Sequence, residues 1–159
     1  FRVIDAFSRI VRLGERVAAT GELTGDAMER AAEALEVCAG KLRRRGVTHF
    51  RGVATEACRK ARNGGDFLQR VFRDTGIDLE IIAPREEAEL ALASCAPLLD
   101  SRQRYAVLFD IGGGSTEVTW LMGRGRGGWE MIDSISIQCG VIAFAERFGG
   151  DTAAKKKEK

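Results

Sequence analysis

The sequence lacks the features that mark several large classes of protein. None of its apolar runs approaches the roughly 20 residues that a membrane-spanning helix needs. No basic N-terminal stretch precedes an apolar core of the kind found in signal peptides. The charge of the 159 residues is almost balanced, with 25 Lys+Arg, 23 Asp+Glu and a net charge of +2. Because residues 155–159 supply +3 of this charge, the rest is nearly neutral, which disfavours a protein that coats nucleic acid.

The few cysteines and the single histidine form no pattern typical of a metal site. The four cysteines are far apart and include no C-x-x-C pair, which argues against zinc; they are Cys38, Cys58, Cys95 and Cys139. Each lies in an apolar or small-residue stretch, so we expect buried free thiols in a reducing compartment rather than two disulfides. His49 has no Cys or Asp partner in a catalytic pattern and is expected on a strand surface.

Predicted strands and helices alternate along the chain, which indicates an α/β protein. Strands are predicted over 1–13, 47–54, 79–82, 105–109, 116–122 and 129–135. Helices are predicted over 24–42, from a cap at Asp66, from Pro84 to about Leu99, and over 141–148. The nearly all-apolar run 105–109 is typical of a strand buried on both faces. The polar stretch 100–104 before it is the candidate boundary between lobes.

The strongest local signal is Asp110-Ile-Gly-Gly-Gly-Ser-Thr-Glu117, between two predicted strands. Gly112, Gly113 and Gly114 allow positive φ angles that would direct several N–H groups at one anion, and Ser115 adds a hydroxyl. Asp110, at the end of a strand, is suited to holding Mg²⁺ through water. The motif is not a Walker loop, because no Gly-Lys-Ser/Thr follows and the next element is a strand. A glycine hairpin without a ligand is the alternative.

Two further segments are weaker signals. Glu86 and Glu87 follow Pro84 at a predicted helix start, where acidic residues ordinarily complement the helix dipole. Arg59 lies in Ala54-Thr-Glu-Ala-Cys-Arg-Lys-Ala-Arg-Asn63, where it would clamp a phosphate, although an isolated arginine usually faces solvent. Neither segment assigns a function by itself.

Taken in series from about residue 10 to residue 150, these segments resemble the Ppx/GppA family of exopolyphosphatases and guanosine pentaphosphate phosphohydrolases. The matching segments are Arg12–Glu15, Ala54–Asn63, Glu86–Ala88, Phe109–Glu117, Ser136–Val141 and Glu146–Phe148. The resemblance implies the actin-like, ribonuclease H-like fold of the sugar kinase–Hsp70–actin superfamily, an α/β fold whose mixed sheet has flanking helices. It places a first lobe at 1–100, the start of a second lobe at 104–150, and a disordered tail at 151–159.

The resemblance also implies an activity and its residues. The family releases terminal orthophosphate from inorganic polyphosphate or guanosine pentaphosphate with Mg²⁺, and the resemblance leaves the choice of substrate open. Glu87 would activate water, while Gly112–Ser115, together with Arg59 and Thr55, would bind phosphate. Asp110 would hold the metal, and Glu117 would act beside it as a catalytic residue. A cytoplasmic location, a part in the stringent response and a homodimer of the full-length protein are further expectations; a membrane or a specific nucleic acid is not an expected partner.

The sequence also departs from the family. It lacks the first phosphate loop, Asp-x-Gly-Ser-Asn-Ser/Thr, and ends soon after Ser136–Val141, so most of the second lobe is expected to be missing. Glu56 stands where the family more often has a small residue, which would oppose anion binding. These departures keep open a polyphosphate- or nucleotide-binding module without turnover. An ATP-binding sugar-kinase lobe is a third, poorer fit.

Overall fold

The computed structural model describes residues 3–125 and 127–148, and the chain divides into two compact units, Phe1–Ile81 and Ile82–Lys159. The first unit is built around a short parallel pair of strands, and the second around an antiparallel sheet. The lobe boundaries at 100 and 104 stay a prediction. The tail predicted over 151–159 lies outside the described residues.

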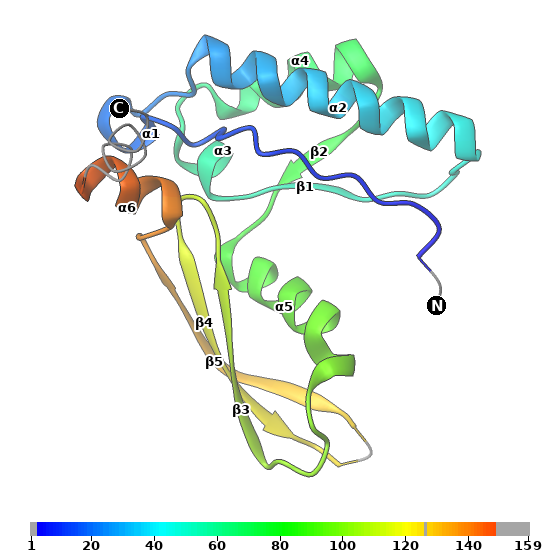
Figure 1. The fold of residues 1–159 in the computed structure, drawn as a ribbon, viewed down its shortest axis with the longest axis vertical. Helices are drawn as coiled ribbons and strands as arrows, with labels where there is room; N and C mark the ends of the chain where they lie inside the picture. The colour runs from blue at the N-terminus through cyan, green and yellow to red at the C-terminus, as the bar shows by residue number, and fades with distance from the viewer. Residues whose placement is uncertain (1–2, 126, 149–159) are drawn as a thin grey trace, which may run out of the picture. The chain divides into compact units, whose positions relative to one another are not determined.

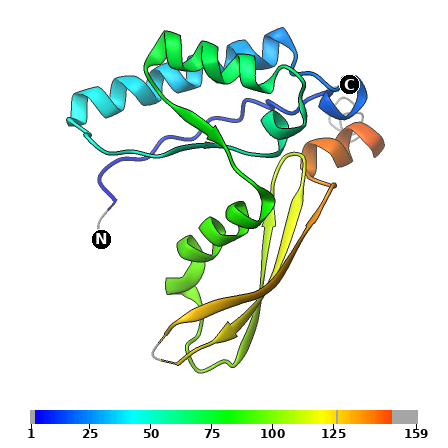
Figure 2. The ribbon, with the colours of Figure 1, turned by 180° about the vertical axis from the view of Figure 1, so that it is seen from behind.

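Over its described residues, the first unit contains four helices and two short strands; two helices precede the first strand, and the other two lie between the strands along the chain. Its elements are α1 (Val17–Thr20), α2 (Gly25–Arg45), β1 (Gly52–Ala54), α3 (Glu56–Lys60), α4 (Gly64–Thr75) and β2 (Leu79–Ile81). β1 and β2 pair in parallel, α2 packs on α4, and α4 contacts β2 (Figures 1 and 2). The side chain of Thr24 caps α2 by accepting the Ala27 N–H, and Gly46 ends the helix in the left-handed conformation.

The core of this unit forms where α2 and α4 meet. Phe67 and Val71 are four residues apart on α4, so they lie on one face of the helix, and both are only 1% exposed. They pack in one apolar cluster with Leu23, Ala31 and Ile77. The core of the first unit is therefore formed by the facing sides of its two longest helices and the chain next to them.

Three predictions for this unit need correction. Residues 3–12 form no strand, since no neighbouring strand pairs with them; they run along α2, where Arg30 donates to the Val11 carbonyl at 3.1 Å. The strand predicted over 47–54 is reduced to β1, because β2 offers only three residues for pairing. The helix predicted from an Asp66 cap begins two residues earlier, and Asp66 lies in its first turn.

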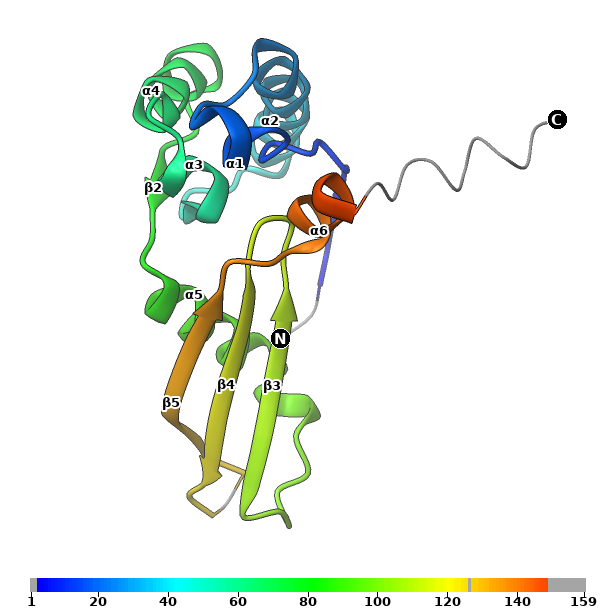
Figure 3. The same ribbon diagram turned by 90° about the vertical axis from the view of Figure 1, so that its left-hand side faces the viewer.

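The second unit is a three-stranded antiparallel sheet with helices at one face and one end. Its elements are α5 (Pro84–Cys95), a 3₁₀ turn (Ala96–Leu98), β3 (Tyr105–Ile111), β4 (Thr116–Gly123), β5 (Trp129–Ile137) and α6 (Val141–Phe148). The strand order is β3-β4-β5, and α5 covers one face of the sheet (Figure 3). Within the described ranges, no helix is long and apolar enough to cross a membrane.

Strand β3 is not buried on both faces as its apolar sequence predicts. Tyr105, Val107 and Phe109 are 57%, 46% and 63% exposed, whereas the alternating Ala106 and Leu108 are half-buried. Side chains alternate between the faces of a strand, and α5 covers only one of them. The other face is apolar and open in the part of the chain that the structure describes.

Candidate functional site

The glycine loop is a tight connection between β3 and β4. Asp110 pairs with Glu117 across the two strands, and the Gly112 N–H donates to the Ser115 carbonyl at 2.9 Å. The prediction of positive φ angles in this loop is wrong. The left-handed glycines among the described residues lie elsewhere, at Gly21, Gly46, Gly76, Gly125 and Gly127.

Space is tight around this loop, because it packs directly on the start of α6. The carbonyls of Gly112, Gly113 and Gly114 accept the N–H groups of Val141, Ile142 and Gly140 at 3.0, 2.8 and 3.1 Å. A Cβ atom on Gly113 would lie 3.1 Å from Ile142 Cδ1. A Cβ atom on Gly140 would lie 2.4 Å from the carbonyl carbon of Gly113. Only glycine therefore fits at Gly140 without moving the loop.

This packing determines which backbone groups the loop offers to a ligand. The carbonyls of the loop face the first amides of α6, the end of a helix that carries partial positive charge. Within residues 3–125 and 127–148, the N–H groups of Gly113 and Gly114 donate to no protein acceptor. Successive unpaired N–H groups in a tight loop are typical of an anion-binding site.

Two carboxylates lie beside this loop. Asp110, Glu117 and Ser136 stand opposite one another on β3, β4 and β5, so their side chains share one face of the sheet. Asp110 is exposed, whereas Glu117 is only 2% exposed and accepts a hydrogen bond from Ser136 Oγ at 2.7 Å. Like charges directly opposite each other destabilise a sheet, and a bound cation would relieve that repulsion.

The Asp110–Glu117 pair fits the way in which enzymes that act on phosphates commonly bind Mg²⁺. Among the described residues, no group of three or more His, Cys, Asp and Glu side chains is placed to hold a metal ion. Mg²⁺ commonly binds through one or two carboxylates and completes its shell with water and substrate phosphates. Asp110 and Glu117 supply that number of carboxylates next to the glycine loop.

Glu87 lies in the first turn of α5, the helix that covers this sheet. Pro84 opens the helix, as predicted, and Ala88, 1% exposed, anchors its first turn against the core. Glu87 itself is half-buried. Helix α5 begins toward the end of the sheet that carries the β3–β4 loop (Figures 1 and 3). The compact unit thus brings the first turn of α5, the acidic pair and the glycine loop to one end.

Thr55 and Arg59 belong to the other compact unit. Thr55 immediately precedes α3 and Arg59 lies in its last turn, and both are half-buried. Glu56 is buried, and its carboxylate lies 2.6 Å from the Lys60 ammonium. Because Lys60 offsets this charge, Glu56 opposes a bound phosphate less than the sequence alone suggests.

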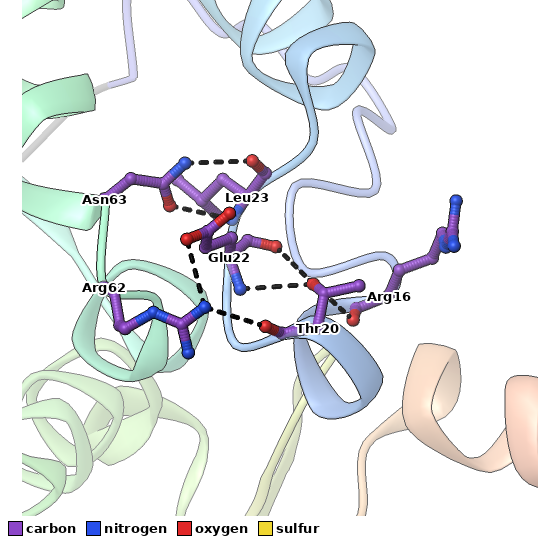
Figure 4. Close-up of polar contacts among 6 residues, drawn as sticks. All are labelled: Arg16, Thr20, Glu22, Leu23, Arg62 and Asn63. Carbon is purple, nitrogen blue, oxygen red and sulfur yellow. Dashed lines mark hydrogen bonds and ion pairs between the residues drawn. The ribbon is translucent and has the colours of Figure 1, made fainter.

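Arg62 and Asn63 end the Ala54–Asn63 motif, and sequence reasoning gave neither of them a role. Asn63 Oδ1 accepts the Leu23 N–H at 2.8 Å, and Asn63 Nδ2 donates to the Leu23 carbonyl at 3.0 Å (Figure 4). Arg62 donates to the Thr20 carbonyl at 3.3 Å and to Glu22 Oε1 at 3.0 Å. These two residues fix the loop before α2 to the turn before α4. The sequence offers a signal only for Asn63, since asparagine side chains in turns often bond to backbone groups.

Comparison with known proteins agrees with this arrangement. The model of the Ppx/GppA phosphatase family matches residues 1–159. The chain belongs to the Ppx/GppA phosphatase family. The Aquifex aeolicus member of this family is 33% identical, with a TM-score of 0.67 over 88% of this chain and 44% of its own. An exopolyphosphatase-like protein of known structure is 28% identical, with a TM-score of 0.83 over 92% of this chain and 47% of its own.

A third solved relative, an exopolyphosphatase from Cytophaga hutchinsonii, is 28% identical, with a TM-score of 0.76. It is matched over 86% of this chain and 42% of its own. The chain thus spans less than half the length of these solved relatives. Their similarity confirms the predicted fold class, an actin-like α/β fold, of which this chain forms a part.

Proposed function

We propose that this chain belongs to a phosphohydrolase that releases terminal orthophosphate from inorganic polyphosphate or guanosine pentaphosphate. One observation carries the proposal: the unpaired amides of Gly113 and Gly114 lie beside the Asp110–Glu117 pair. An anion-binding loop next to two carboxylates suits a substrate that combines phosphate with Mg²⁺. Membership of a phosphatase family supports the same reaction class.

In the proposed mechanism, the N–H groups of the loop and the Ser115 hydroxyl bind the oxygens of the terminal phosphoryl group. Glu87 removes a proton from the attacking water as its oxygen bonds to phosphorus and the anhydride P–O bond breaks. Thr55 and Arg59, on the first compact unit, stay predicted phosphate-binding residues. Asp110 and Glu117 would hold Mg²⁺, which would supply positive charge against the phosphoryl oxygens.

The setting of the reaction is part of the same proposal. The four cysteines are free thiols in the structure, although only Cys58 is buried as predicted. Free thiols suit a reducing compartment such as the cytoplasm. Hydrolysis of guanosine pentaphosphate would connect the protein to the stringent response. We expect the full-length protein to be a homodimer.

Binding without turnover is the second candidate function. It is supported by the amides of Gly113 and Gly114, which could bind an anion without any catalytic group. A site completed by residues outside this stretch would leave the chain alone able to bind phosphate but unable to hydrolyse it.

Orthophosphate release from long-chain polyphosphate and from guanosine pentaphosphate, each with Mg²⁺, tests the proposal. We expect Glu87→Gln to lower kcat by about 10²–10⁴-fold, since that is the usual contribution of a general base. The matched control is Glu89→Gln, an exposed position on the same helix whose carboxylate pairs with Arg85 at 3.2 Å. Equal rates for the parent and Glu87→Gln would refute the role of Glu87. Binding of polyphosphate without release would support the second candidate.

A further inference from the structure

We infer that Ser136 is a positioning residue, whose hydroxyl holds the carboxylate of Glu117 in the orientation that the reaction requires. The inference rests on the proposed function, because it assigns a task to Glu117 at the same site. No sequence signal singled out Ser136 for this task, since its contact with Glu117 depends on how β4 and β5 pair.

The contact is short, and it lies at a buried carboxylate. Ser136 Oγ lies 2.7 Å from Glu117 Oε1, within the usual range for a hydroxyl donating to a carboxylate. Glu117 is only 2% exposed, so water contributes little to solvating its charge. A buried carboxylate is strongly destabilised unless protein donors replace water, and the Ser136 hydroxyl supplies one.

The neighbours of Glu117 make this hydroxyl an orienting group. Asp110 stands directly opposite on β3 with a charge of the same sign, and Ser136 stands opposite on β5 with a hydroxyl that donates to Glu117 Oε1. With Oε1 held by Ser136, the other carboxylate oxygen of Glu117 stays available to a cation beside Asp110. The Ser136 hydroxyl thereby fixes the orientation of Glu117.

The end of β5 is itself fixed to the glycine loop, so the position of the Ser136 hydroxyl depends on that loop. Thr116 Oγ1 donates to the Cys139 carbonyl at 2.6 Å, and the Gly140 N–H donates to the Gly114 carbonyl at 3.1 Å. These bonds lie three and four residues beyond Ser136. The segment that orients Glu117 therefore also supports the loop proposed to bind the phosphoryl group.

The test compares Ser136→Ala with Ser136→Thr, which keeps the hydroxyl and suits a strand. Ser134→Ala is the matched control, two residues earlier on β5 and opposite Thr119 instead of Glu117. We expect Ser136→Ala to lower kcat by about 10–100-fold, the usual effect of removing a group that orients a ligand residue. KM measured with saturating Mg²⁺ should stay near the parent value, because the loop amides and the Ser115 hydroxyl, rather than Glu117, are proposed to bind the phosphoryl group. Ser136→Thr should recover most of the lost kcat, and Ser134→Ala should match the parent.

Parent kcat in Ser136→Ala, or equal losses in the Ala and Thr variants, would overturn the inference. A second measurement separates it from the proposed function. Urea unfolding of Ser136→Ala, Glu117→Met and the double variant should be non-additive, with Ser136→Ala shifting the midpoint less when Glu117 is absent. Additive shifts would overturn the inference even if the parent released no phosphate. Non-additive shifts in an inactive parent would support the Ser136–Glu117 contact while the proposed function failed.

Discussion

The side-chain amide of Asn63 is matched at both of its polar atoms to the backbone of Leu23, a residue 40 positions earlier (Figure 4). The carbonyl oxygen accepts the Leu23 N–H at 2.8 Å, and the NH₂ group donates to the Leu23 carbonyl at 3.0 Å. Leu23 is only 3% exposed, so water has little access to this backbone. The Asn63 side chain therefore supplies both hydrogen-bond partners of the buried Leu23 backbone, which pairs with no strand.

Replacing Asn63 should destabilise the first compact unit. Asn63→Ala leaves the buried N–H and C=O of Leu23 without their partners, and we expect the free energy of unfolding to fall by about 1–3 kcal/mol. Asn63→Asp should destabilise as well, because a carboxylate cannot donate to the Leu23 carbonyl. Chemical denaturation of both variants measures this. Gln69→Ala, at an exposed position on α4, is the control and should change stability by less than about 0.5 kcal/mol.

The sequence predicted well those helices whose ends are determined by residues close by in the chain. The helix predicted over 24–42 forms as α2, Pro84 opens α5 as predicted, and α6 occupies the residues predicted for it, Val141–Phe148. Capping residues act through groups within one turn of helix, so no tertiary information is needed to recognise them. Residues 3–12 were predicted wrongly because a strand needs a partner, and propensity does not supply one.

The turn at the candidate site could be predicted from the sequence, but its packing could not. The glycines of the Asp110–Glu117 segment indicate a tight turn between two strands, and its role in binding an anion stays a prediction. The Ser136–Glu117 bond requires the register of β4 with β5, which is set across 19 residues of chain. The need for glycine at Gly140 arises from backbone contacts with Gly112 and Gly113, which only the folded structure brings together.

Gly140→Ala should disrupt the glycine loop. The added Cβ would lie 2.4 Å from the Gly113 carbonyl carbon and 2.5 Å from the Gly112 oxygen, and backbone atoms cannot rotate away as a side chain can. We expect the backbone amide resonances of the loop to shift and its response to added polyphosphate to be lost, as followed by NMR titration. Gly128→Ala is the control, because its Cβ would meet nothing closer than 3.5 Å. If the loop amides of Gly140→Ala shifted with added polyphosphate as those of the parent do, the loop would tolerate the displacement.

Cys58 and Cys139, which differ most in exposure, should react with alkylating agents at very different rates. Cys58 is only 3% exposed, and burial raises the pKa of its thiol to about 11, from an ordinary value of 9.0. The reactive thiolate is therefore about 100-fold scarcer for Cys58 at neutral pH than for an ordinary cysteine. Cys139 is exposed. Iodoacetamide labelling followed by peptide mass spectrometry should modify Cys139 first, and Cys58 only after denaturant is added; early labelling of Cys58 would contradict its burial.

Acid should weaken the attachment of Glu15 to the start of α2. Arg30 lies 2.9 Å from the Glu15 carboxylate, and hydrogen bonding by Arg30 holds the pKa of Glu15 below its ordinary value of 4.5. A carboxyl whose pKa is lowered by folding stabilises the native state above its unfolded pKa, and that contribution is lost as the pH falls through the folded pKa. The free energy of unfolding of the parent and of Glu15→Gln should be measured from about pH 6 to about pH 2. The parent should be more stable at the upper end, and the difference should shrink as the pH falls.

Glu33→Gln, the control, removes an exposed ion pair with Arg9. Its free energy of unfolding should follow that of the parent across this pH range, since such pairs contribute little. A constant difference between the parent and Glu15→Gln across this range would show that the charge of Glu15 does not stabilise the fold.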